Sequence, residues 1–194
     1  IPTNSDDADS YFSMCNGQPA YNLIHLDALY DILQHTYVDA NLVGKRKGNE
    51  RAALCNMIDR SAVDNALLIA DRGYESYNIM AHCQEKGWKF LIRIQDSANS
   101  RGIASGLILP ATDEFDVCFN LSITTKQTNE TKQLAKDRLH YKIINTSTSF
   151  DFLPLKNKKF NPTVFYDLSF RVVRFKLSDN SYETVITNLD TVDF

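Results

Sequence analysis

The chain has 194 residues, a formal charge of −3, and 43% hydrophobic and 23% charged residues. This is the composition of a soluble globular protein with one large domain, or one domain that carries an insertion. It lacks the overall basic footprint of a nucleic-acid-binding domain, so any DNA-binding role must rest on local basic clusters. The four cysteines and four histidines are scattered, which excludes a zinc motif and a dense disulfide framework. With no transmembrane-length apolar run and no signal peptide, we expect a cytoplasmic protein.

The N-terminal part is predicted to form a loop, a β-hairpin and a helix. Residues 1–20 are polar and acidic and contain prolines, which is typical of a loop. Within residues 22–33 the even positions from 24 to 32 are apolar, a period of two that predicts a strand with one face more deeply buried. Residues 37–43 are close enough to pair with it as an antiparallel hairpin. Asn49 is a good N-cap, and the apolar residues that follow predict a helix over residues 49–60.

A short apolar run, residues 66–70, ends abruptly at Asp71. Such a run suits a strand that is buried on both faces of a parallel sheet. Ligands of open α/β sheets bind at the carboxyl ends of the strands, so Asp71 would stand at a promising place. Gly73 would then allow a tight turn into the next helix. The alternative is that Asp71 only caps a helix or starts a turn.

The next segment completes a βαβ unit. Tyr77, Met80 and Cys83 share one helical stripe, and Gly87 fits the C-terminal cap of that helix. Residues 90–94 then read as the next strand. A strand, a helix and a strand over this short distance predict a parallel pair with a right-handed crossover.

The second half is predicted to be mostly β. Strict alternation over residues 115–123 indicates a strand, and residues 139–144 indicate another. Residues 168–177 and 182–187 should form a hairpin across a Ser-Asp-Asn-Ser turn. We predict no helix in this half, and residues 150–162 look irregular.

Ala70-Asp71-Arg72-Gly73-Tyr74, followed by a helix and Phe90-Leu91-Ile92-Arg93, resembles the second-aspartate motif of IS4-type DDE transposases. Other segments have counterparts in the same order, namely Ile1-Pro2-Thr3-Asn4, residues 25–31, residues 170–175 and residues 182–189. The resemblance therefore covers essentially the whole chain.

The resemblance implies an α/β fold, a ribonuclease H-like mixed sheet with helices that is incomplete and carries a β-rich insertion in the second half. Residues 1–97 would be the partial catalytic core. Residues 98–194 would be the β-rich insertion, ending before the glutamate helix of the family. Such enzymes cut and rejoin DNA at transposon ends with two aspartates and a glutamate that hold two divalent ions. Mg²⁺ or Mn²⁺ suits those oxygen ligands, and a metal pair suits phosphoryl transfer.

Asp71 matches the second aspartate of that triad and is implied to be catalytic and a metal ligand. The first aspartate would lie upstream of Ile1 and the glutamate downstream of Phe194, so we expect this chain alone to be inactive. Asp27, Asp31 and Glu85 match other family positions and are expected to be surface charges.

The candidate DNA contacts are the basic residues that could reach phosphate: Arg72, Arg93, Lys45, Arg46 and Lys47. For the run 45–47 a solvated charge cluster is the alternative. Gly73 and Tyr74 would support the site, Tyr74 as a packed aromatic, and Lys156, Lys158 and Lys159 are further candidates.

The implied partners are transposon-end and target DNA, with a homodimer in the DNA complex and no membrane, as for a bacterial-type mobile element protein. Two other readings stay open. One is a non-catalytic transposase remnant that binds DNA or protein. The other is a different metal nuclease on the same fold.

Overall fold

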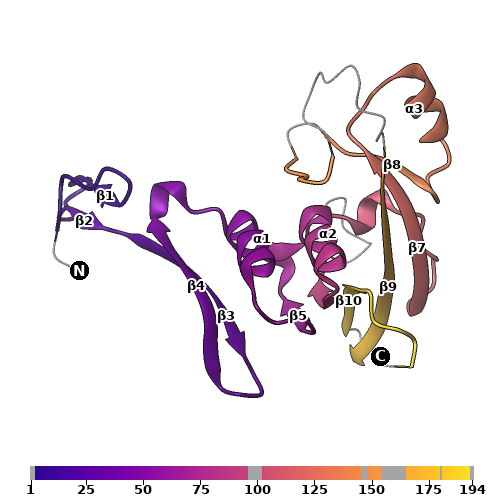
Figure 1. Cartoon of the computed structure of the whole chain (residues 1–194), viewed down its shortest axis with the longest axis horizontal. Coiled ribbons are helices and arrows are strands. Elements are labelled where there is room, and N and C mark those ends of the chain that lie inside the picture. Colours follow the sequence, from indigo (N-terminus) through magenta and orange to yellow (C-terminus); the bar gives the residue numbers. More distant parts are fainter. Residues whose placement is uncertain (1–2, 96–101, 146–147, 154–164, 180, 193–194) are drawn as a thin grey trace. The chain divides into compact units, whose positions relative to one another are not determined.

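The computed structural model describes residues 3–95, 102–145, 148–153, 165–179 and 181–192. The chain divides into two compact units, Ile1–Ala62 and Val63–Phe194, called unit 1 and unit 2 (Figure 1). The described residues form a mixed α/β structure with three α-helices and a six-stranded mixed sheet, which is consistent with a ribonuclease H-like core. The predicted division at residue 97 stays a prediction.

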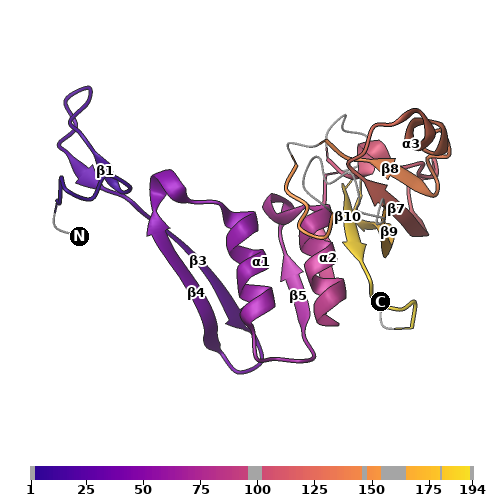
Figure 2. The same ribbon diagram turned by 45° about the horizontal axis from the view of Figure 1, so that its top comes forward.

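Unit 1 contains the predicted hairpin and helix. Its elements are β1 (Tyr11–Phe12), β2 (Tyr21–Asn22), β3 (Ile24–Asp31), β4 (Thr36–Gly44), the 3-10 helix η1 (Lys45–Lys47) and α1 (Glu50–Arg60). β3 and β4 pair antiparallel, with Leu26 opposite Leu42. The side chain of Asn49 accepts a hydrogen bond from the Ala52 N–H and caps α1, as predicted. Figure 2 shows α1 lying along the β3–β4 hairpin.

One face of β3 is the more buried, as predicted, but it is the face that carries polar residues. Asp27 is only 5% exposed, whereas its apolar neighbour Leu26 is 63% exposed. α1 packs on the Asp27 face, and His25 Nε2 lies 3.0 Å from Asp27 Oδ1. The expectation that Asp27 is a surface charge is therefore wrong, because the helix covers the side of the strand on which it lies.

Unit 2 is built on one mixed sheet. Its strands are β5 (Leu67–Ala70), β6 (Lys89–Arg93), β7 (Phe115–Thr124), β8 (Tyr141–Ile143), β9 (Tyr166–Ser178) and β10 (Ser181–Thr187). Its helical elements are η2 (Arg72–Tyr74), α2 (Tyr77–Lys86), η3 (Ala104–Gly106) and α3 (Asn129–Leu134). The strand order is β5-β6-β10-β9-β7-β8, so β10 enters the sheet beside β6.

The predicted βαβ unit is confirmed. β5 and β6 are parallel, with Leu68 opposite Phe90, and α2 connects them. Ser76 caps α2 through its side chain, and Gly87 ends it with a left-handed φ of 75°. Figures 1 and 2 both show α2 beside β5.

The prediction that β5 is buried on both faces is wrong. Leu68 is buried, but Ile69, which points to the opposite face, is 56% exposed. Within the described sheet β5 is the edge strand, and it pairs with β6 alone. A continuous apolar run therefore does not prove two-sided burial.

The β-rich second half is confirmed in its strands but contains one helix that we did not predict. β7 pairs antiparallel with β9, and β9 forms a hairpin with β10. α3 begins at Asn129, after the side chain of Thr128 accepts a hydrogen bond from the Thr131 N–H. This segment is polar and has no apolar period, so only its capping residue marks it. Residues 154–162 of the stretch expected to be irregular lie outside the described residues.

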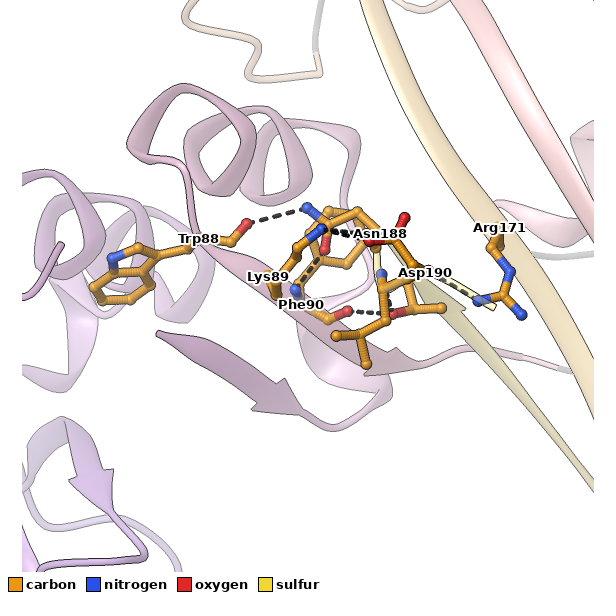
Figure 3. A network of polar contacts seen from close by, with 8 residues as sticks. Trp88, Lys89, Phe90, Arg171, Asn188 and Asp190 are labelled. Atoms are coloured by element: carbon orange, nitrogen blue, oxygen red, sulfur yellow. Dashed lines mark hydrogen bonds and ion pairs between the residues drawn. The ribbon is translucent and has the colours of Figure 1, made fainter. Parts of the chain in front are cut away.

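Asn188 ties the end of β10 to β6 (Figure 3). Its Oδ1 accepts a hydrogen bond of 2.7 Å from the Phe90 N–H, and its Nδ2 donates one of 3.0 Å to the Trp88 carbonyl. Thr187 Oγ1 donates to the Phe90 carbonyl at 2.6 Å. These bonds satisfy main-chain groups where the β6–β10 ladder ends, so they hold the two strands in register.

A second side-chain cluster holds residues 148–153 on α2. Asp151 Oδ2 accepts a hydrogen bond of 2.8 Å from Asn78 Nδ2 and lies 3.0 Å from His82 Nε2. The Asp151 N–H in turn donates to Asn78 Oδ1 at 2.9 Å. The pKa of the Asp151 carboxyl is lowered, chiefly by the Asn78 hydrogen bond and further by His82, in spite of partial desolvation.

None of the helices among the described residues has the length and hydrophobicity that crossing a lipid bilayer requires.

Replacing Asn188 by Ala should lower the free energy of unfolding by about 1–3 kcal/mol, because it leaves two main-chain groups without partners. Urea denaturation at neutral pH measures this change. The matched control is Asn65→Ala, at an exposed position before β5, where a change within about 0.5 kcal/mol is expected. Equal effects of the two substitutions would contradict the role of Asn188.

The Asp151 cluster predicts a pH dependence of stability. A carboxyl with a lowered folded-state pKa stabilises the fold above its unfolded pKa of about 3.9, and this contribution is lost as the pH falls through the folded value. The melting temperature of Asp151→Asn should therefore lie below that of the wild type at neutral pH. The difference should shrink below about pH 4. A difference that stays constant into that acid range would show that the charge of Asp151 is not involved.

Candidate functional site

Asp71 directly follows β5 and starts the turn η2. Its main-chain carbonyl accepts a hydrogen bond of 2.9 Å from the Tyr74 N–H, but its side chain makes no capping hydrogen bond. The carboxylate contacts Arg93 instead, with Asp71 Oδ1 at 3.2 Å from Arg93 Nη1. The Asp71 side chain is 69% exposed. The turn therefore uses the backbone of Asp71 and leaves the carboxylate accessible.

The parallel pairing of β5 and β6 brings Asp71 and Arg93 together. Ala70 lies opposite Ile92, so the residue after each lies at the same end of the two strands. Parallel strands present their carboxyl ends at the same edge of a sheet. The ion pair between Asp71 and Arg93 is a direct consequence of the crossover through α2.

Glu183 of β10 completes the cluster. Its Oε1 lies 3.3 Å from Arg72 Nη2, and its Oε2 accepts a hydrogen bond of 2.7 Å from Arg93 Nη2. The Glu183 side chain is 13% exposed, whereas both arginine side chains are about half exposed. One carboxylate thus anchors two guanidinium groups beside Asp71.

The charges in this cluster stabilise one another. Burial raises the pKa of the Glu183 carboxyl, but the hydrogen bond from Arg93 and the charges of Arg93 and Arg72 outweigh burial, and the net pKa lies below the usual value. The hydrogen bond and charge of Glu183 raise the pKa of Arg93, to which Asp71 adds a smaller effect. Glu183 and Arg93 are therefore ionised at neutral pH.

Sequence reasoning missed Glu183 as a site residue. The segment around it was noticed, but nothing in its local pattern links it to a residue some 90 positions earlier. The link is made by the sheet, because β10 pairs with β6 and places Val185 opposite Arg93. Only that strand order could have revealed it.

Gly73 and Tyr74 lie in η2 next to Asp71. The described glycines with a positive φ are Gly17, Gly87 and Gly102, so the turn at Gly73 does not use the left-handed conformation. Tyr74 is partly buried, and its N–H closes the turn on the Asp71 carbonyl. Both residues shape the turn.

The basic run 45–47 belongs to unit 1, where each residue has a local contact. Lys47 Nζ forms an ion pair of 2.5 Å with Asp9. Arg46 Nη2 donates to the Tyr11 carbonyl at 2.9 Å, and its guanidinium lies 4.6 Å from the centre of the Phe12 ring. Lys45 Nζ lies 3.4 Å from His25 Nδ1. Arg46 in particular is part of the structure of unit 1. Lys156, Lys158 and Lys159 lie outside the described residues.

Asp31 and Glu85 have local structural contacts. Asp31 Oδ1 accepts hydrogen bonds from the N–H groups of Leu33 and Gln34 in the β3–β4 turn. Glu85 accepts a hydrogen bond of 2.7 Å from the Tyr166 hydroxyl. Neither residue contacts the Asp71 cluster through these bonds.

The Asp71 carboxylate is the hard oxygen donor that Mg²⁺ and Mn²⁺ prefer. Among the described residues no group of three or more metal-ligating side chains comes together. The side chains of the described part of the chain therefore do not by themselves form a complete metal site.

The chain was compared with models of known protein families. A family model described as "Transposase DDE domain" matches residues 1–148, which include Asp71, Arg72 and Arg93 but not Glu183. Comparisons with curated proteins and with solved structures found no significant match.

The contacts of the basic run predict different effects for two neighbouring residues. Arg46→Ala should destabilise unit 1 by roughly 1–2 kcal/mol, because it removes a charged hydrogen bond and a cation–π contact. Lys45→Ala should change stability by less than about 0.5 kcal/mol. Denaturant unfolding of both variants tests this. If Arg46→Ala leaves the stability unchanged, the run 45–47 is a solvated charge cluster instead.

Proposed function

The chain belongs to the transposase DDE domain family, and on that basis we propose that it is the core portion of an IS4-type DNA transposase. The observation that carries this proposal is the exposed carboxylate of Asp71 at the end of β5, flanked by Arg93. Residues 1–97 are then the partial catalytic core and residues 98–194 the β-rich insertion. Such a mobile element protein would act on DNA in the bacterial cytoplasm.

Asp71 is the residue of this chain that would hold a divalent ion, with further ligands supplied from elsewhere in the active site. A pair of such ions, when bound, helps to activate the attacking oxygen and to stabilise the leaving oxygen in phosphoryl transfer. The exposure of the Asp71 carboxylate and its lack of a capping hydrogen bond to the turn support this role. Arg93 now forms an ion pair with the Asp71 carboxylate. It is therefore close enough to Asp71 to change its contacts when a divalent ion binds that carboxylate instead.

Arg72 and Arg93 are the proposed contacts to the DNA backbone. A guanidinium presents several N–H donors in a planar fork that matches the oxygens of a phosphate. Both side chains are about half exposed and are anchored at one edge by Glu183. Phosphate contacts of this kind position DNA without reading its sequence.

The net charge of −3 is compatible with this proposal because the contacts are local. The run 45–47 is a weaker candidate, since Arg46 and Lys47 already have partners within unit 1. A homodimer on DNA stays a prediction from the resemblance.

The test is Asp71→Ala in the protein that carries this chain. Metal-dependent cleavage of transposon-end DNA should fall by at least about a hundredfold, since the loss of a metal ligand removes several kcal/mol of transition-state stabilisation. DNA binding should stay largely intact. Asp64→Asn, an exposed carboxylate just before β5, is the control and should cleave normally.

Wild-type cleavage by Asp71→Ala would overturn the assignment of the catalytic carboxylate. Metal-independent DNA binding without any cleavage by the wild-type protein would instead indicate a non-catalytic transposase remnant. Cleavage without strand joining would indicate a different metal nuclease on this fold.

A further inference from the structure

We propose that Glu183 is a positioning residue of this site, which holds the guanidinium groups of Arg72 and Arg93 beside Asp71 so that they receive a DNA phosphate together. This inference rests on the proposed DNA-binding function and assigns a role to a residue outside the matched family segment.

The Glu183 carboxylate lies between the two arginines. Each Glu183 oxygen serves a different arginine, with Oε1 at 3.3 Å from Arg72 Nη2 and Oε2 at 2.7 Å from Arg93 Nη2. Two guanidinium groups that share one small region repel each other, and a carboxylate between them offsets that repulsion. A single side chain therefore fixes the spacing of both positive groups.

Glu183 is anchored in an inner strand of the sheet. β10 lies between β6 and β9 in the sheet, with Glu183 opposite Phe175 of β9. On the other side the Ile94 N–H donates to the carbonyl of Thr184, the next residue, at 3.0 Å. The Glu183 backbone thus sits in a strand that is paired on both edges, whereas Arg72 and Arg93 lie at the ends of their elements.

Glu183 is much less exposed than the two arginines that it contacts. The Glu183 side chain is 13% exposed, but those of Arg72 and Arg93 are 49% and 47% exposed. An arginine has five N–H donors, and the Glu183 contacts described above engage Nη2 of each. The Glu183 carboxylate is largely buried, whereas about half of each arginine side chain is open to solvent, which suits a phosphate ligand.

If Glu183 were only a nearby negative charge with no positioning role, its removal would have the opposite effect on DNA binding from the removal of an anchor. Removing such a charge reduces repulsion of the DNA backbone, so it should tighten binding. Removing an anchor releases both arginines and should weaken binding. The sign of the change therefore separates the two roles.

The experiment measures binding of the chain to a short DNA duplex of fixed sequence by fluorescence anisotropy over a range of salt concentrations. Glu183→Gln should weaken binding roughly three- to tenfold, as expected for the loss of two ordered ion pairs. The slope of log affinity against log salt should become shallower by about 1–2. Asp179→Asn is the matched control, because it removes one negative charge from the same hairpin at a side chain that is 98% exposed. It should bind as tightly as the wild type or slightly more tightly.

A second variant tests position alone. Glu183→Asp keeps the charge but shortens the side chain, so it should also weaken binding, which a pure charge effect would not. This variant carries the test if Glu183→Gln is unfolded by circular dichroism. In an Arg72→Gln/Arg93→Gln background, Glu183→Gln should have no further effect on affinity.

Unchanged or tighter binding by Glu183→Gln or Glu183→Asp overturns the proposal. An equal loss of affinity in the double-arginine background also overturns it, because Glu183 would then act by another route. A folded wild-type chain that does not bind DNA at all refutes the proposed DNA-binding function itself, and this inference falls with it. If Asp71→Ala cleaves DNA like the wild type while the Glu183 variants bind DNA more weakly as expected, only the catalytic assignment of Asp71 is refuted.

Discussion

The parallel pairing of β5 with β6 is the constraint on which the candidate site depends. α2 connects the two strands, and its cap residues Ser76 and Gly87 set the length of the crossover. Because the strands are parallel, their carboxyl ends meet at one edge, where Asp71 and Arg93 form an ion pair. Without that crossover the motif around Asp71 would be a turn with no defined neighbour.

β10 adds a second carboxylate, which the β5–α2–β6 crossover alone does not supply. It pairs antiparallel with β6 and brings Glu183 to the same edge from far along the chain. Asn188 closes the end of this pairing by bonding the main chain of Trp88 and Phe90 (Figure 3). The cluster therefore contains two acidic and two basic side chains, and we propose that its affinity for an anion depends on where the guanidinium groups are held more than on net charge.

The sequence could predict the local elements well and their burial poorly. Caps, alternation and short turns depend on neighbouring residues, so α1, α2, β7 and the β9–β10 hairpin were foreseeable. Burial depends on which face another element covers, so the exposure of Ile69 and the burial of Asp27 were not. Asp71 was found because it follows an apolar run, whereas Glu183 needed the strand order. α3 was missed because its signal is a single threonine cap.

We propose that Asp71 binds a divalent ion next to a DNA phosphate that Arg72 and Arg93 hold. The most direct test is a crystal structure of the protein that carries this chain with transposon-end DNA and Mn²⁺, using anomalous scattering to locate the metal. We expect a Mn²⁺ peak at coordination distance from an Asp71 oxygen and a backbone phosphate hydrogen-bonded to Arg93. A bound metal remote from Asp71, with the Asp71–Arg93 ion pair still closed, would contradict it.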